Sequence, residues 1–175
     1  MDEFVILVDN TDKEWGKMEK IKAHELGLLH RAFSIFIFNT SGKLLLQQRA
    51  FHKYHSGGLW TNSCCGHPRL GETVSDAAHR RLEEELGMQC NLTNGFHFIY
   101  KANMENQLTE HEFDHVFFGV SDEIPNPNEN EVAAWKYNSL EEIEKEIRLD
   151  KSVYTEWFKI CFSKVKAYYK DNYIK

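Results

Sequence analysis

Short apolar runs separated by turn residues recur along the chain and are typical of β-strands. Each run is rich in Val, Ile, Leu, Phe or Tyr and is only five to ten residues long. The runs cover residues 4–8, 32–38, 43–48, 96–102, 110–119 and 132–137. The polar stretch Asn39–Gly42 between the second and third runs is a hairpin signal.

Helical spacing replaces this pattern in three places. Between Thr73, an N-cap candidate followed by Asp76, and the C-terminal stop Gly87, apolar residues recur at the period of a helix. A second helix begins after Ser139, and a third covers about residues 150–169. Strands, a central helix, more strands and terminal helices predict an α+β fold, an α/β/α sandwich with a mixed central sheet. We expect a single domain over residues 1–175.

Composition and charge narrow the class of protein. The chain is 42% hydrophobic and has no apolar run of transmembrane length, so we expect no membrane partner. Its net charge of −6 argues against a nucleic-acid partner but permits a local basic site for a phosphorylated small molecule. The first apolar run is too short for a secretory signal. The cysteines show no disulfide-framework spacing, so we expect a reducing cytoplasm: Cys64, Cys65, Cys90 and Cys161.

One carboxylate of the central helix falls where the helical period predicts an apolar residue. Glu85 lies near the middle of the apolar stripe, and a buried carboxylate is costly unless it is paired or bound to a cation. Arg81, one turn earlier, could form an internal ion pair with it. The preceding turn, CCGHPRLGE, instead places a thiol and an imidazole beside a carboxylate-rich helix, which favours a metal. Both interpretations stay open on these residues alone.

Two further stretches have a structural and a functional interpretation. Residues 49–59 form either a solvated loop or a clamp in which Arg49 and Lys53 bind an anion. If residues 110–119 form a strand, alternation places three carboxylates on one face. These carboxylates are Glu110, Glu112 and Asp114. They repel one another without a nearby cation, unless the strand is an exposed edge protected by charge.

The segment from Gly66 to Met88 resembles the Nudix box, whose second half reads REUxEExGU with U apolar. Arg81 stands where the pattern has its first Glu. The matching residues are Gly66, Glu72, Arg80, Leu82, Glu84, Glu85, Gly87 and Met88. In Nudix hydrolases the box carboxylates bind magnesium, which assists attack of water on a diphosphate. Arg81 removes one metal ligand and adds a cation that can bind a diphosphate. The resemblance implies a Nudix-like fold.

Nearly the whole chain is similar to a narrower family, the type I isopentenyl-diphosphate isomerases. The matching features are two spaced histidines before HRAFSIFIF, then QQRA, WTNSCCGHP, GE…RRLEEELG, a tyrosine, EHE and a tryptophan in the last helix. The resemblance implies conversion of isopentenyl diphosphate to dimethylallyl diphosphate, a step that supplies isoprenoid biosynthesis. Moving this double bond by protonation and deprotonation passes through a tertiary carbocation. The reaction requires an acid, a base, a dry pocket and a grip on the diphosphate.

The resemblance also implies roles for the reacting residues. Cys65 is the catalytic cysteine, Glu112 is the opposing acid or base, and Cys64 is structural. Tyr100 hydrogen-bonds the active-site glutamate. Trp157 presents its π face to the carbocation while it packs in the core. One of Cys65 and Glu112 must be protonated when the other is not, and which begins so stays open.

Two metal sites and a basic grip are implied in the same way. A divalent transition metal, Mn²⁺ or Zn²⁺, is bound by His24, His30, His67, Glu110 and Glu112. Glu85 binds Mg²⁺ that bridges to the diphosphate. The diphosphate itself contacts Lys20, Arg49, Lys53 and Arg81. Ser56 and Gly57 stand where the family often has an aromatic residue and a proline, which we expect to loosen a loop over the site. We expect a small diphosphate substrate and a monomer or homodimer.

Two other classes of function compete with this interpretation. A Nudix pyrophosphohydrolase would share the box, but Arg81 in place of Glu argues against hydrolysis. A metal- or redox-responsive module could use Cys64, Cys65 and the histidines. Adjacent cysteines without a second pair do not have zinc-ribbon spacing, and this module leaves the EHE strand without a role.

Overall fold

The computed structural model describes residues 3–173, so residues 1–2 and 174–175 of the expected domain lie outside the described residues. Groups of strands are separated by helices along the chain, and helices end it. The elements are β1 (Phe4–Val8), β2 (Glu14–Glu19), α1 (Lys20–Leu26), β3 (His30–Phe38), β4 (Leu44–Arg49), β5 (Trp60–Thr61), β6 (Cys64–Gly66), α2 (Val74–Leu86), β7 (Thr93–Asn103), η1 (Glu105–Gln107), β8 (Thr109–Val120), β9 (Val132–Asn138), α3 (Leu140–Leu149), η2 (Lys151–Val153) and α4 (Glu156–Tyr173). No helix within residues 3–173 combines the length and the hydropathy needed to span a bilayer.

Strand β3 is the centre of the sheet. It runs antiparallel to β1, β4 and β6 and parallel to β8, so the predicted mixed sheet is confirmed. β8 also pairs with β7, and β9 pairs with β4. Because β8 lies between β3 and β7, the interpretation of residues 110–119 as an exposed edge strand is wrong.

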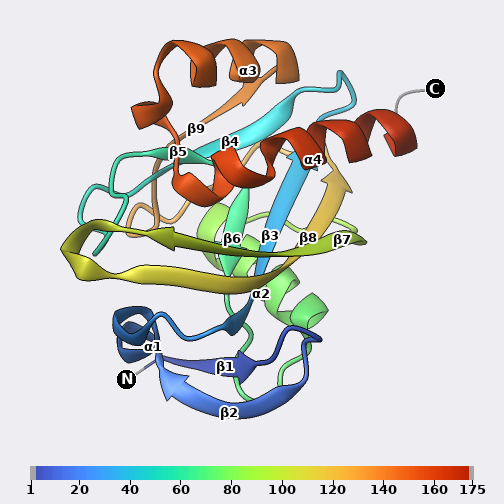
Figure 1. Cartoon of the computed structure of the whole chain (residues 1–175). Coiled ribbons are helices and arrows are strands. Elements are labelled where there is room, and N and C mark those ends of the chain that lie inside the picture. Colours follow the sequence, from blue (N-terminus) through green and yellow to red (C-terminus); the bar gives the residue numbers. More distant parts are fainter. Residues whose placement is uncertain (1–2, 174–175) are drawn as a thin grey trace.

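Helices cover both faces of the sheet, with α4 crossing one face and α2 on the opposite side (Figure 1). Alternate residues of β3 supply the two cores, as the period of a strand requires. Phe36 and Phe38 pack in the cluster that includes the buried side of α4. Ile35 and Ile37 pack with the buried side of α2. This three-layer arrangement confirms the predicted α+β sandwich.

The ends of α2 follow from its sequence. The Thr73 hydroxyl accepts a hydrogen bond from the backbone N–H of Asp76, and Gly87 adopts the left-handed φ of 60° that ends the helix. Glu85 is buried within the helix's inward face, as its place in the apolar stripe indicated. Both predicted helix ends are confirmed.

Several elements differ from the sequence expectation, including α1, β5 and β6, which were not predicted. Strand β2 was not predicted, because its partly exposed residues lack the apolar face that marked the other strands. The last helix begins at Glu156 rather than near residue 150, so the expected start is wrong. Tyr154 is instead extended and bridges to Trp60, and Thr155 donates its backbone N–H to the Trp60 carbonyl, 3.0 Å away. These contacts attach the chain to β5 just before α4 begins.

Candidate active site

A cavity of about 260 Å³ collects side chains from both ends of the chain. All of the residues expected to react or to bind the diphosphate line it. They are Cys65, Glu112, Tyr100, Trp157, Lys20, Arg49, Lys53 and Arg81. Glu85, Glu110 and His67 line it as well. The rings of His24 and His30 lie 6.0 Å and 5.1 Å from the His67 ring. The cavity therefore joins the chemistry that the sequence distributes over separate motifs.

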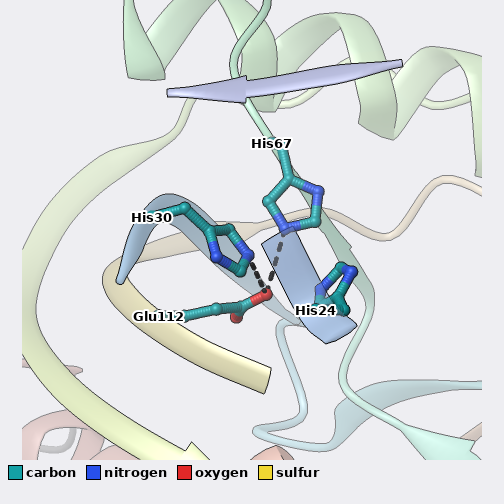
Figure 2. A group of neighbouring side chains, drawn as sticks. All are labelled: His24, His30, His67 and Glu112. Atoms are coloured by element: carbon teal, nitrogen blue, oxygen red, sulfur yellow. Dashed lines mark hydrogen bonds and ion pairs between the residues drawn. The ribbon is translucent and has the colours of Figure 1, made fainter. Parts of the chain in front are cut away.

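Three imidazoles and one carboxylate converge beside this cavity (Figure 2). One potential ligand atom from each of His24, His30, His67 and Glu112 lies within 4.8 Å of all the others. His67 Nε2 is 3.0 Å and His30 Nε2 is 3.5 Å from Glu112 Oε1. The sheet creates this contact, because His30 on β3 is the direct register partner of Glu112 on β8.

The donor set fits a divalent metal. Both ring nitrogens of His24 and Nε2 of His30 are buried and have no hydrogen-bond partner in the described part of the chain. His30 Nδ1 lies 2.8 Å from the Leu28 carbonyl, which fixes that nitrogen as the N–H and leaves Nε2 free to ligate. Burial, with the neighbouring histidines, lowers the pKa of His24 to about 3 and keeps its imidazole neutral. Neutral imidazoles with a carboxylate suit Mn²⁺, iron or Zn²⁺.

Tyr100 connects Glu112 to Glu110. Its hydroxyl oxygen is 2.6 Å from Glu112 Oε2 and 2.9 Å from Glu110 Oε2. Burial and the charge of Glu112 raise the pKa of Glu110 well above its usual value. Burial also opposes ionisation of Glu112, but contacts with His30 and His67 lower its pKa well below the usual value. The phenol has a single proton, so it donates to only one of these two carboxylates at a time.

Glu110 lies next to the four-residue cluster, on the same face of β8 as Glu112. Its Oε1 is 3.2 Å from Nε2 of His55, and its other oxygen contacts Tyr100. The next carboxylate on that face is Asp114, which accepts a hydrogen bond from Ser34 and leaves one oxygen unpartnered. Burial raises the pKa of Asp114 well above its usual value. All three carboxylates thus face inward, as the alternation predicted.

The two adjacent cysteines have different surroundings. Cys64 is completely buried and packs under α2. Cys65 lines the cavity, and burial raises the pKa of its thiol. The following residue, Gly66, has no room for a side chain, because a Cβ there would lie 2.9 Å from the Phe33 ring. The glycine therefore permits β6 to pack closely against β3.

Trp157 belongs to the core and to the cavity at once. It lies on the buried side of α4, where it is 4% exposed and belongs to the hydrophobic core. It also lines the cavity. The guanidinium of Arg49 lies 5.3 Å from the centre of its ring, within the range of a cation–π contact. Both interpretations of Trp157, as a core residue and as a cavity residue, are therefore compatible with the structure.

The basic side chains of the cavity are held by carboxylates. Lys20 pairs with Glu3 at 2.5 Å, and Lys53 pairs with Glu131. Arg81 pairs with Glu85, so the internal ion pair that the helix pattern allowed is present. These acidic neighbours raise the pKa of Arg81 although burial opposes its charge. Arg49 also lines the cavity, and its buried Nε has no hydrogen-bond partner within residues 3–173. The cavity wall can thus bind a diphosphate.

Sequence reasoning missed His55 as a cavity residue. His55 is 5% exposed, and its ring lies 6.0 Å from the Trp157 ring and 6.2 Å from the His24 ring. Burial and the charge of Arg49 lower its pKa to about 3. The sequence alone does not distinguish it from His52, an exposed residue of the same basic loop.

Comparisons with known proteins agree on the family. Residues 28–158 match the NUDIX domain family. The chain is 48% identical over 166 residues to "Isopentenyl-diphosphate Delta-isomerase" of Pectobacterium atrosepticum, covering 95% of this chain and 93% of that protein. It is 52% identical to "Isopentenyl-diphosphate Delta-isomerase 2" of Photorhabdus laumondii, covering 91% and 90%.

Solved structures show the same fold at lower identity. A crystal structure from Deinococcus radiodurans superposes with a TM-score of 0.76 at 21% identity, covering 95% of this chain and 99% of that one. A MutT protein from Methanosarcina mazei superposes with a TM-score of 0.65 at 17% identity, covering 79% and 94%.

Proposed function

The chain belongs to the NUDIX domain family and, within it, to the isopentenyl-diphosphate Delta-isomerases, and we propose that it converts isopentenyl diphosphate to dimethylallyl diphosphate. The observation that carries this proposal is one cavity shared by a buried thiol, a carboxylate, an indole and four basic side chains. We propose that residues 1–175 act as a single domain.

The basic side chains would hold the diphosphate. Arg49 has a free buried donor, and Lys20, Lys53 and Arg81 line the same cavity. Carboxylate partners hold Lys20, Lys53 and Arg81 in place before the substrate arrives. A charge-assisted grip of this kind fixes the five-carbon chain against the reacting groups. It also distinguishes a diphosphate from an uncharged alkene.

Cys65 and Glu112 would move the protons. One group delivers a proton to the terminal carbon of the double bond, which leaves positive charge on the tertiary carbon. The other group removes a proton from the carbon on the far side of that centre, and the double bond forms there. Tyr100 orients Glu112 by a 2.6 Å hydrogen bond. The Trp157 ring, which lines the cavity, stabilises the transient cation through its π face.

Two metal ions would be held by residues in and beside the cavity. His24, His30, His67 and Glu112, with Glu110 beside them, would hold one divalent transition metal, Mn²⁺ or Zn²⁺. Glu85 would bind Mg²⁺ together with the diphosphate. A bound divalent ion supplies positive charge that polarises its ligands and neutralises the diphosphate. We also propose that the enzyme is cytoplasmic, a compartment in which the four free cysteines would stay reduced. We propose that it is a monomer or a homodimer.

The direct test follows both possible products of isopentenyl diphosphate. Purified protein with Mg²⁺ and Mn²⁺ is expected to form an acid-labile diphosphate, because an allylic diphosphate ionises readily in acid. Phosphorus NMR is expected to show an intact diphosphate throughout. Release of monophosphate or inorganic phosphate without an acid-labile product would instead support the pyrophosphohydrolase. No change in metal-replete protein would reject both activities.

A further inference from the structure

The structure assigns a positioning role to Asn62: we infer that its amide oxygen fixes the Cys65 thiol and the Trp157 indole relative to each other. This inference rests on the proposed isomerisation, in which both side chains act on the same carbocation. Asn62 lies between β5 and β6, is completely buried, and does not line the cavity itself.

The orientation of the Asn62 amide is determined by its backbone neighbours. Its Nδ2 lies 3.1 Å from the Ile35 carbonyl oxygen and 2.7 Å from the Cys64 carbonyl oxygen. A carbonyl oxygen can only accept, so both of these contacts require the NH₂ group. The amide oxygen must therefore face the other way, toward the side chains of the site.

Side chains from separate elements donate to that single oxygen. The Cys65 thiol is 3.1 Å from it, and the Trp157 indole N–H is 3.2 Å from it. The hydroxyl of Thr61 also donates to it, at 2.8 Å. An indole nitrogen can only donate, so Trp157 needs an acceptor at this buried position. One atom thus connects β6, which carries the thiol, to α4, which carries the indole.

The surrounding chain keeps Asn62 in place. The Thr61 hydroxyl contacts the Thr155 hydroxyl at 2.9 Å, immediately before α4 begins. On the other side, the backbone N–H of Ser63 donates to the Ile35 carbonyl on β3, 3.1 Å away. Asn62 is therefore held by the sheet and by the start of α4, which suits a group that must position others.

Such positioning matters more for the rate than for binding. Misplacing a reacting group by about 1 Å can cost about a hundredfold in rate. Removal of Asn62 would release the thiol from its acceptor and let the indole ring rotate away from the cavity. The described contacts of the Asn62 side chain include none of the basic residues that would hold the diphosphate. We therefore expect an effect on kcat rather than on KM.

The test compares Asn62→Ala with Ser63→Ala in metal-replete protein. Both residues are fully buried and hydrogen-bonded, but Ser63 contacts neither Cys65 nor Trp157. Asn62→Ala is expected to lower kcat by about tenfold to a hundredfold, with KM and metal content within about twofold of wild type. Ser63→Ala is expected to keep its kcat within about threefold. Equal kcat values for the two variants would overturn the inference.

A second variant decides the matter if Asn62→Ala does not fold. Trp157→Phe keeps an aromatic ring and removes the N–H that donates to Asn62. It is expected to lower kcat by about threefold to tenfold without raising KM. Where Asn62→Ala does fold, the two losses in the double variant should be clearly less than multiplicative, because each removes the same hydrogen bond. A wild-type kcat in Trp157→Phe, or fully multiplicative losses, would overturn the inference.

The wild-type protein separates this inference from the proposed function. If it does not convert isopentenyl diphosphate, the proposed function fails. If it does and Asn62→Ala keeps the same kcat, only the positioning role fails.

Discussion

At the scale of single residues, the two adjacent cysteines of this site have different surroundings. Cys64 is enclosed in the core under α2, whereas Cys65 points to the cavity beside Asn62. The alternation of a strand explains the difference, because neighbouring residues of β6 face opposite sides of the sheet. A pair of identical residues thus provides a built-in control for the chemistry of the thiol.

Replacing Cys65 by Ala is expected to lower turnover by about 10²-fold to 10⁴-fold, because it removes one of the two proton-transfer groups. Cys64→Ala should lower stability by about 1 kcal/mol through a small core cavity and keep its turnover. Activity assays and thermal unfolding of the two variants check both outcomes. Full turnover in Cys65→Ala would remove the cysteine from the mechanism while leaving the fold unaffected.

His55 offers a second residue-scale test. Its Nε2 is 3.2 Å from Glu110, so His55→Leu should loosen a carboxylate beside the metal cluster. We expect metal affinity or activity to fall by about tenfold to a hundredfold, as for other residues that orient metal ligands. His52→Leu, in the same loop but exposed, is the matched control and should change neither. Identical metal titrations of the two variants would contradict the role of His55.

At the scale of elements, α2 carries two neighbouring arginines that both pair with Glu84 and differ in their other partners. Arg81 faces the cavity and pairs with Glu85, while Arg80 pairs with Glu72 away from the cavity. Arg81→Gln should raise KM for the diphosphate by about tenfold or more, since a hydrogen bond to a charged group contributes about 1.5–3 kcal/mol. Arg80→Gln should weaken the helix without changing KM. Steady-state kinetics of both variants provide the measurement, and equal KM values would place the diphosphate elsewhere.

The elements themselves were largely readable from the sequence. Helix α2 has its caps and its apolar stripe in the local pattern, and β8 has its alternation of carboxylates. Strand β2 could not be predicted, because pairing with β1 rather than an apolar face holds it in the sheet. The start of α4 depends on the bridge between Tyr154 and Trp60, a contact between residues far apart in sequence.

The site was predictable only in part, because it also depends on contacts between residues far apart in sequence. A resemblance to a known family named most of its residues, but the spacing of His24 and His30 along the chain does not by itself indicate a metal site. Their convergence depends on the parallel pairing of β3 with β8 and on the position of α1. His55 and Asn62 depend on contacts with Glu110 and Trp157, which no spacing in the sequence reveals.

At the scale of the whole molecule, the buried histidines make stability depend on pH. An unfolded histidine binds a proton near pH 6.5, whereas the folded protein keeps the pKa of His55 at about 3. Between these values the unfolded chain binds more protons, so this contribution is present above the unfolded pKa and is lost as pH falls. For a single histidine the change is about 1.4 kcal/mol per pH unit.

His55→Gln should therefore reduce the pH dependence of the free energy of unfolding in metal-free protein. The expected reduction is up to about 1.4 kcal/mol per pH unit between pH 6 and pH 4. Denaturant unfolding with a chelator present measures it, and His52→Gln is the control that should follow wild type. Parallel pH dependences for His55→Gln and wild type would show that His55 takes up its proton in the folded protein as well.

The family identifies the reaction, and the cavity supports our proposal that this protein moves the double bond by adding one proton and removing another. Proton NMR of the purified protein with isopentenyl diphosphate, Mg²⁺ and Mn²⁺ in heavy water tests it most directly. Dimethylallyl signals are expected to grow, with deuterium entering the newly formed methyl group. Unchanged isopentenyl diphosphate in metal-replete protein, or a dimethylallyl product without deuterium in that methyl group, would contradict it.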